Sequence, residues 1–218
     1  MAKNENMLSP FEFIQHCTTK ISCERPEGTS SGTGFFFKFK LGDSSVGVIV
    51  TNKHVVENSE IGSFKLTMLG NDKKPNLQDI VPVSADGFLK KWIFHPDPNV
   101  DLCIFPIGEV HHELQKQGKT AALAYLEESH IPQKLEHYRP TEEIFMIGYP
   151  TGLGDEKHNL PLVRKGITAT PFYIEHNGKP EFMVDCACFP GSSGSPILMV
   201  SEGIYTLHNQ TPRMGNRI

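Results

Sequence analysis

The feature that most limits the fold of this chain is a series of short apolar segments separated by turn residues. The segments are rich in Val, Ile, Phe and Leu, and Gly, Pro, Asn or Asp stands between them. They cover residues 19–24, 35–40, 46–51, 64–69, 80–83, 102–107, 143–148, 162–170, 182–188 and 196–200. Short strands at turn-punctuated intervals are typical of sandwiches and barrels. We therefore predict an all-β fold.

Two parts of the chain depart from this pattern. Ser9-Pro10-Phe11-Glu12 has the capping hydroxyl, the proline and the closing glutamate of a helix start, which predicts a short helix ending near Cys17. Residues 110–117 and 121–128 look helical and lie between two β-rich halves. We expect a single domain in which 1–107 is the N-terminal helix and first half, 108–140 a connector and 141–218 the second half.

The segment Phe35–Lys40 alternates in a way that predicts which side chains share a face. Phe35, Phe37 and Phe39 fall on one side of an extended strand, and both lysines fall on the other.

Composition excludes several classes of function. The chain has 218 residues, 21% of them charged, and a formal net charge of −4, so neither nucleic acid nor an anionic membrane is an expected partner. No apolar run approaches the roughly 18 residues of a membrane span, and the N-terminus has no export signal.

Cysteine usage bears on location and on metals. The five cysteines are odd in number and lie in apolar segments, which favours reduced thiols, small buried groups and a cytoplasmic protein. Cys186-Ala187-Cys188 is too short and isolated for a metal site. His95, His111, His112 and His158 lack carboxylate or cysteine partners at ligand spacing. We expect no metal and no cofactor.

Three segments place reactive side chains beside apolar strands. They are 51–56, with His54 where a strand ends; 99–104, with Asp101 where a strand begins; and 190–196, with Ser193 in a glycine-flanked turn. A serine hydroxyl needs an imidazole to take its proton, and the imidazole needs a buried carboxylate on its other nitrogen. The N–H groups of Gly191 and Ser193 would stabilise the oxyanion of a tetrahedral intermediate.

The order of these residues also separates folds. His, then Asp, then Ser is the order of chymotrypsin, whereas subtilisins and α/β-hydrolases have other orders. Each residue alone has a structural explanation, since a lone histidine is usually structural and Gly-Ser-Ser-Gly-Ser alone is usually a linker. The three together, in order and in strand context, favour a catalytic triad.

The chain resembles the trypsin-like (chymotrypsin-fold) serine peptidase superfamily, and within it the HtrA-like bacterial branch. The matching segments are Ser31–Phe35, Val50–Val56, Val100–Ile104, Gly148–Gly154 and Asp185–Pro196. The resemblance implies two six-stranded antiparallel β-barrels after the short N-terminal helix. The chain ends early for this superfamily, so a second barrel that is incomplete at its C-terminus stays open as an alternative. Ser195 stands where the superfamily usually has a second glycine.

The resemblance also implies a substrate pocket and a mode of control. Ala187 falls at the pocket floor with Cys188 beside it, and His208 falls near the pocket wall if 204–208 is the wall strand rather than one arm of a hairpin. An alanine floor favours small or aliphatic side chains at the cleavage site. Ser192 replaces the aspartate that digestive relatives pair with a new N-terminus, so ordering of loops by substrate or a regulatory protein is the expected switch.

The resulting hypothesis is a serine endopeptidase that acts on protein or peptide substrates through an acyl-enzyme. The alternative is a catalytically silent, protease-like binding or scaffold module. An esterase of another fold is disfavoured by the order of the triad residues.

Overall fold

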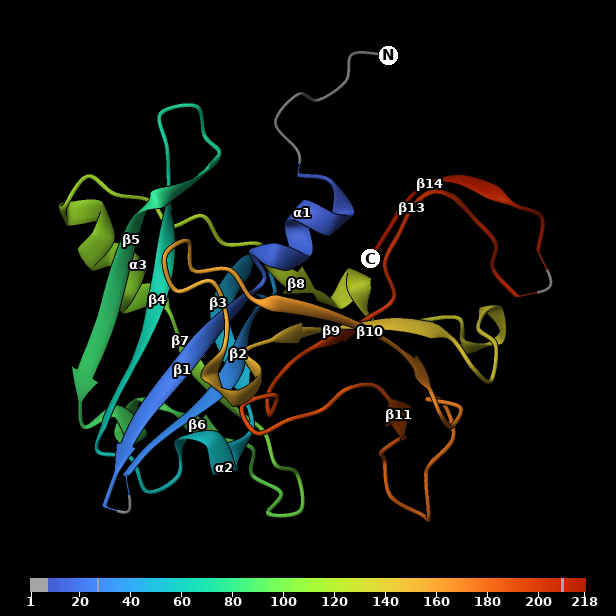
Figure 1. Cartoon of the computed structure of the whole chain (residues 1–218), viewed down its shortest axis with the longest axis horizontal. Helices are drawn as coiled ribbons and strands as arrows, with labels where there is room; N and C mark the ends of the chain where they lie inside the picture. Colours follow the sequence, from blue (N-terminus) through green and yellow to red (C-terminus); the bar gives the residue numbers. More distant parts are fainter. Residues whose placement is uncertain (1–7, 27, 209) are drawn as a thin grey trace.

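The computed structural model describes residues 8–26, 28–208 and 210–218, and most of its regular structure is β (Figure 1). The helices are α1 (Pro10–Gln15), α2 (Lys53–Val56) and α3 (Gly108–Lys116), with 3₁₀ turns at Phe88–Lys91, Glu128–His130, Leu135–His137 and Pro150–Gly152. The strands are β1 (Thr18–Arg25), β2 (Gly28–Leu41), β3 (Ser44–Thr51), β4 (Ile61–Leu69), β5 (Pro75–Asp86), β6 (Ile93–Phe94), β7 (Cys103–Pro106), β8 (Leu126–Glu127), β9 (Glu143–Gly148), β10 (Leu162–Thr168), β11 (Val184–Asp185), β12 (Ile197–Leu198), β13 (Ser201–Tyr205) and β14 (Arg213–Arg217).

The strands form three sheets. The first has eight strands in the order β5-β4-β1-β2-β3-β7-β6, with β8 added parallel to β2; the second is β11-β10-β9-β12; and the third is the hairpin β13-β14. Apart from β8 the neighbours pair antiparallel, as short connections between strands favour. The pairing among the described residues closes no sheet on itself, so the two six-stranded barrels stay a prediction.

The N-terminal helix forms as its sequence predicts. The Glu12 N–H donates to Ser9 Oγ at 3.3 Å, the Ser9 N–H donates to Glu12 Oε2 at 2.8 Å, and Pro10 occupies the first turn. These bonds satisfy backbone donors that the helix itself leaves unpaired. The helix ends at Gln15, and β1 begins at Thr18.

The predicted shared face of three phenylalanines in β2 is confirmed, and the opposite face of the same strand holds a further buried residue. Phe35, Phe37 and Phe39 line one apolar cavity of 370 Å³, together with Ile197 of β12. Phe36, on the face that carries the lysines, is only 2% exposed and belongs to the main core. The lysines follow Phe36 along a strand of 14 residues that leaves the core towards solvent.

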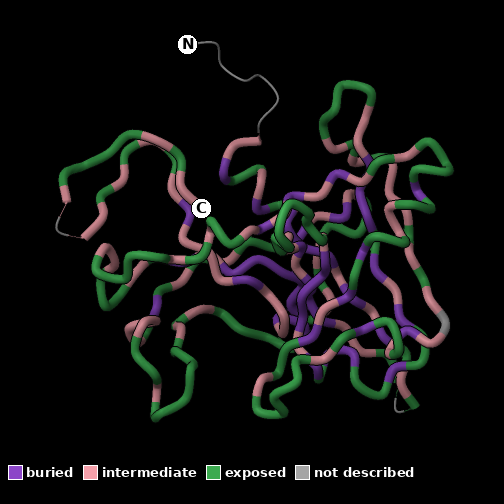
Figure 2. Tube along the Cα trace, turned by 180° about the vertical axis from the view of Figure 1, so that it is seen from behind, coloured by how far each residue is buried: buried purple, intermediate pink, exposed green. Residues whose placement is uncertain are grey.

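The core is unevenly distributed. Fourteen apolar residues and Leu114 of α3 pack together inside the first sheet, with the rings of Phe64, Phe88 and Trp92 around Phe105. A smaller cluster joins α1 to the second sheet through Ile14 and Ile147. Figure 2 shows the buried trace concentrated in the body of the molecule, whereas the C-terminal hairpin on the left is half-buried or exposed.

The predicted helix over 121–128 is wrong. The Ala122 N–H donates to Thr67 O and the Ala124 N–H donates to His16 O, so the segment is extended between β4 and the end of α1. Ala122, Ala124 and Leu126 are buried while the residues between them are half-buried, which is a period of two. Tertiary hydrogen bonds therefore decide against the helix that Ala and Leu favour locally. The helix predicted over 110–117 is present as α3.

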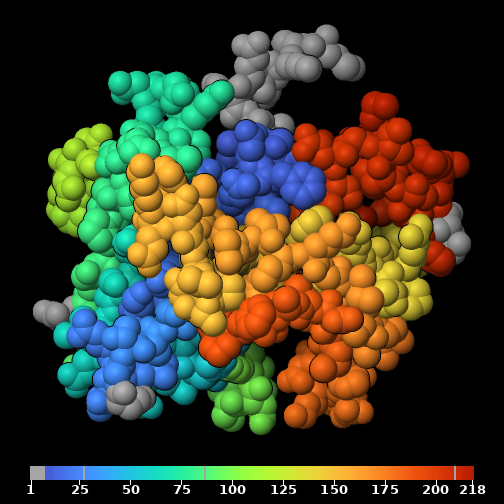
Figure 3. Space-filling view, in the orientation of Figure 1, coloured from blue at the N-terminus to red at the C-terminus, as the bar shows by residue number. Residues whose placement is uncertain are grey.

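The C-terminal residues form the hairpin that the sequence left open as an alternative. Ile204 pairs with Met214, and Tyr205 pairs with Arg213. Figure 3 shows this red hairpin beside the blue surface of α1. The strand predicted over 182–188 is shorter than expected, because only Val184 and Asp185 pair with β10.

The described cysteines are all free thiols, and Cys17, Cys23 and Cys103 are buried small groups as the sequence indicates. In the part of the chain that the structure describes, no helix is long and apolar enough to cross a membrane. No group of His, Cys, Asp or Glu side chains among residues 8–26, 28–208 and 210–218 could hold a metal ion.

Candidate active site

The pairing of β3 with β7 brings the predicted histidine and aspartate together. Thr51, the last residue of β3, is opposite Cys103, the first residue of β7. His54 follows the end of β3 in the short helix α2, and Asp101 precedes the start of β7. Because the two strands are antiparallel, these ends lie at the same edge of the sheet.

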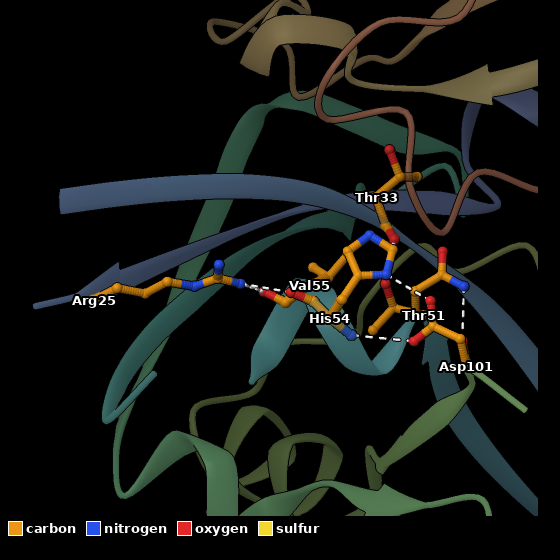
Figure 4. Close-up of polar contacts among 7 residues, drawn as sticks. Arg25, Thr33, Thr51, His54, Val55 and Asp101 are labelled. Carbon is orange, nitrogen blue, oxygen red and sulfur yellow. Dashed lines mark hydrogen bonds and ion pairs between the residues drawn. The ribbon is translucent and has the colours of Figure 1, made fainter. Parts of the chain in front are cut away.

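The two side chains make a direct hydrogen bond. His54 Nδ1 is 2.5 Å from Asp101 Oδ2, and the His54 N–H donates to Asp101 Oδ1 at 3.2 Å (Figure 4). The side chain of Asn52 donates to the Asp101 carbonyl at 2.7 Å. An ionised carboxylate at Nδ1 keeps the proton on that nitrogen and leaves Nε2 able to accept one.

This pair is more exposed than the chemistry of a triad suggests. The side chains of His54 and Asp101 are 54% and 48% exposed. Solvent therefore screens the attraction between them, and the geometry of the contact orients the ring more than its energy stabilises the fold.

An arginine holds the other side of the histidine turn. Arg25, at the end of β1, donates from Nη2 to the His54 carbonyl at 2.6 Å and to the Val55 carbonyl at 2.9 Å (Figure 4). A cation suits the carbonyl end of a helical turn. Sequence reasoning missed Arg25, because nothing in the pattern of β1 indicates which turn its side chain reaches.

Residues 186–196, between β11 and β12, form the loop that carries Ser193, called the serine loop below. Thr33 of β2 makes two hydrogen bonds to this loop. The Thr33 N–H donates to the Ser193 carbonyl at 2.8 Å, and Thr33 Oγ1 donates to the Gly191 carbonyl at 3.0 Å. Thr33 is fully buried. Its side chain and its backbone therefore fix two carbonyls of the serine loop.

Two glycines allow the loop to come this close. Gly191 has φ +87° and Gly194 has φ +82°, backbone conformations that other residues rarely adopt. A Cβ on Gly194 would lie 2.0 Å from the Thr33 carbonyl oxygen and 2.4 Å from Thr51 Oγ1. The serine loop thus touches the end of β3, three residues before His54.

The N–H groups predicted to bind an oxyanion lack internal partners. In the described part of the chain, neither the Gly191 N–H nor the Ser193 N–H makes a hydrogen bond. The preceding carbonyls are both hydrogen-bonded: that of Pro190 accepts from the Thr151 N–H, and that of Ser192 accepts from the Ser195 N–H within the same loop. Because carbonyl and N–H point in opposite directions across a trans peptide, both N–H groups point away from those bonds.

Ser193 and His54 belong to neighbouring segments but are not hydrogen-bonded to each other. Among the described residues no such bond joins Ser193 Oγ to His54 Nε2. Catalytic hydrogen bonds are often long in unliganded enzymes and tighten when substrate binds.

The predicted pocket residues separate. Ala187 and Cys188 lie exposed in the loop before the serine, and the Ala187 carbonyl accepts a hydrogen bond from Arg164 of β10 at 2.8 Å. The His208 N–H instead donates to the His137 carbonyl in the connector at 2.9 Å. The hairpin therefore keeps His208 with the connector, and its role in the pocket stays a prediction.

A thiol also lies close to the pair. Burial and the charge of Asp101 raise the pKa of Cys103 to about 12. Cys103 is therefore protonated at neutral pH and does not compete with a hydroxyl as nucleophile.

Comparison with known proteins decides the family. The family described as Trypsin-like peptidase domain matches residues 32–203, which include His54, Asp101 and Ser193. The chain belongs to this family. No curated protein matches the sequence.

Solved structures resemble this trypsin-like peptidase domain in fold. AlgW, an HtrA-type protease, in two structures with a tripeptide, is 16% identical with a TM-score of 0.52, covering 96% of this chain and 58% of that chain. A serine endoprotease from Yersinia pestis is 16% identical with a TM-score of 0.48, covering 90% of this chain and 58% of that chain. The peptidase domain thus spans 58% of the length of these proteins. The resemblance to HtrA-type proteases predicted from the motifs is confirmed at the level of fold.

Proposed function

We propose that this trypsin-like peptidase domain is a serine endopeptidase with the triad His54, Asp101 and Ser193. The observation that supports this most is the hydrogen bond from His54 Nδ1 to Asp101 Oδ2 at 2.5 Å, at the edge of the sheet against which the serine loop packs. A binding module has no need of this pair beside a serine in a glycine-flanked loop.

The chemistry follows from the roles of these groups. Ser193 Oγ attacks the carbonyl carbon of the scissile peptide bond while His54 Nε2 takes the hydroxyl proton, and Asp101 stabilises the imidazolium that forms. The carbonyl oxygen becomes an oxyanion that accepts hydrogen bonds from the Gly191 and Ser193 N–H groups. His54 then gives the proton to the leaving amine, the C–N bond breaks, and water hydrolyses the Ser193 ester with His54 as base.

The proposal extends to substrate and architecture. Substrates are proteins or peptides with a small or aliphatic side chain entering a pocket at Ala187 and Cys188. His208 joins the pocket wall only if the hairpin moves. The division at 107 and 140 and a two-barrel arrangement belong to the same proposal, as do a cytoplasmic location, supported by the buried free thiols, and control by a regulatory protein.

A silent binding module is the second candidate. Two observations favour it: in the part of the chain that the structure describes, no hydrogen bond joins Ser193 to His54, and the Asp101 side chain is 48% exposed.

A fluorophosphonate probe separates the two candidates, because it labels only a serine activated by a neighbouring base. We expect the wild-type protein to be labelled and Ser193→Ala to lose all labelling. Ser195→Ala is the matched control, since it removes a hydroxyl two residues away and should keep the labelling. A folded wild-type protein without labelling would support the binding module. Sequencing the products of a peptide-library digest then tests the preference for small or aliphatic side chains.

A further inference from the structure

A half-buried arginine, Arg164, contacts the serine loop from the second sheet. Arg164 lies in β10 and pairs with Met146 of β9, which in turn pairs with Ile197 of β12. Its backbone is therefore held inside an antiparallel sheet. From this position its side chain reaches across to the loop that precedes Ser193.

One nitrogen of Arg164 makes two bonds to this loop. Nη1 donates to the Ala187 carbonyl at 2.8 Å and to Ser192 Oγ at 2.8 Å. The two acceptors lie at the beginning and the end of residues 187–192, so one cation spans the loop. Hydrogen bonds from a charged donor are stronger than those between neutral groups.

The hydrogen bond from Arg164 to Ser192 reaches the residue between Gly191 and Ser193, whose N–H groups are the proposed oxyanion donors. Ser192 is only 6% exposed, and its Oγ also accepts a hydrogen bond from the Phe189 N–H at 3.2 Å. Gly191 and Ser193, on either side of it, carry the N–H groups that have no hydrogen-bond partner among residues 8–26, 28–208 and 210–218. Fixing the Ser192 side chain therefore limits rotation of the peptide units on both sides.

Burying part of the Arg164 guanidinium costs free energy unless hydrogen bonds compensate for the lost hydration. Among the described residues its Nε and Nη2 are buried without hydrogen-bond partners, and no carboxylate forms an ion pair with it. The two bonds from Nη1 are the contacts that compensate for burial of the cation.

We propose that Arg164 is a positioning residue that holds the serine loop in the shape in which the Gly191 and Ser193 N–H groups bind the oxyanion. This inference rests on the proposed endopeptidase function. Digestive relatives bring a cation, the new N-terminus, to the residue before the serine by cleaving the chain. Here the sheet itself supplies a cation to Ser192, so the loop is held without cleavage.

The test compares Arg164→Met with Lys165→Met, a matched control. Lys165 is the next residue of the same strand, and it is exposed and paired with Glu143 on the surface. Loss of one oxyanion donor lowers kcat by about 100-fold or more. We expect Arg164→Met to lower kcat by about this factor, to change KM by less than about threefold, and to weaken binding of a peptidyl boronate in proportion to kcat/KM. The control should leave all three unchanged.

Two further measurements distinguish positioning from general stability. Added ethylguanidinium should restore part of the kcat of Arg164→Ala, which repair of an unstable fold would not do. If the Arg164 variants do not fold, Ser192→Ala removes one of the two acceptors of Arg164, together with the acceptor of the Phe189 N–H, and leaves the arginine in place. It should lower kcat and boronate affinity together while the melting temperature stays close to that of the wild type.

The outcomes are separable. Unchanged kcat and boronate affinity in Arg164→Met, in a background where the wild type is active, would overturn the positioning role alone. The same holds for Ser192→Ala if it is fully active. A wild-type protein that neither labels nor cleaves would overturn the endopeptidase function, and this inference with it.

Discussion

At the scale of single residues, the contact between His54 and Asp101 orients the histidine ring. Asp101 accepts hydrogen bonds from both the ring and the backbone N–H of His54, so rotation of the imidazole would break one contact while the other remains. Arg25 holds the carbonyls of the same turn from the opposite side. The histidine is thus fixed by its neighbours, although its side chain is half exposed.

Replacing Asp101 by Asn tests this orientation. An amide cannot keep the Nδ1 proton in place as a carboxylate does, so the wrong tautomer would face the serine. We expect turnover of a peptide substrate to fall by about 10⁴-fold with an unchanged melting temperature. Asp97→Asn, in the exposed turn that leads to Asp101, is the matched control and should keep wild-type turnover. Near-wild-type turnover of Asp101→Asn would contradict the triad.

At the scale of elements, α1 and α3 each have a half-buried histidine. His16 caps the end of α1, and His111 lies in α3, where its Nε2 is 3.3 Å from the Tyr125 hydroxyl. Burial lowers the pKa of both histidines from their ordinary value of 6.5. Both are therefore neutral in the fold at pH 7, which lets His111 accept a hydrogen bond from Tyr125.

These lowered pKa values predict a loss of stability in mild acid. As pH falls below 6.5, the unfolded chain binds protons at His16 and His111 before the folded chain does. Their contribution is fully present above that pH and is lost as pH falls towards the lowered pKa of the folded state. Urea unfolding should show a lower free energy of unfolding at about pH 5.5 than at about pH 7.

Variants of the two histidines test whether these residues cause the pH dependence of stability. His16→Gln and His111→Gln together should flatten the pH dependence, whereas Gln15→Ala, at the exposed end of α1, should leave it as in the wild type. An equally steep dependence in the double histidine variant would show that other groups cause it.

At the scale of the whole molecule, the core is concentrated in the first sheet and the edges of the second half are thinly covered. Cys17 and Cys103 are almost completely buried, and burial raises the pKa of each thiol to about 12. Cys188 is exposed in the serine loop. The thiols therefore report on different parts of the fold.

The rates at which a thiol reagent modifies the individual cysteines should reflect this difference in burial. At about pH 8 we expect fast modification of Cys188 in the native protein, and modification of Cys17 and Cys103 only at the rate at which the fold opens. Cys188→Ser should remove the contribution of Cys188 to the fast phase and leave that of the half-buried Cys186, and urea should make all five thiols reactive. Fast labelling of Cys103 in the native protein, located by mass spectrometry, would contradict the packing of β7.

Features that depend on neighbouring residues could be predicted from the sequence, whereas features that depend on contacts between distant residues could not. The capping box at Ser9, the strands with a period of two and the glycine-flanked serine are local patterns, so they could be predicted from neighbouring residues. The order of His54, Asp101 and Ser193 limited the fold family because triads of different folds are ordered differently. The helix predicted over 121–128 failed because its backbone partners, Thr67 and His16, lie far away in the chain.

The sequence by itself determined the mostly β class and the family, because periodicity, turn residues and the order of motifs can be seen along the chain. It also predicts the residues that carry the proposed chemistry. Tertiary structure alone decided that β3 and β7 bring His54 to Asp101 and that Thr33 and Arg164 contact the serine loop, and it also decided that Arg25 reaches the His54 turn. The sequence does not indicate where the charged group at the end of a long, flexible side chain will lie in the fold. Only packing selects which carbonyl or hydroxyl it meets.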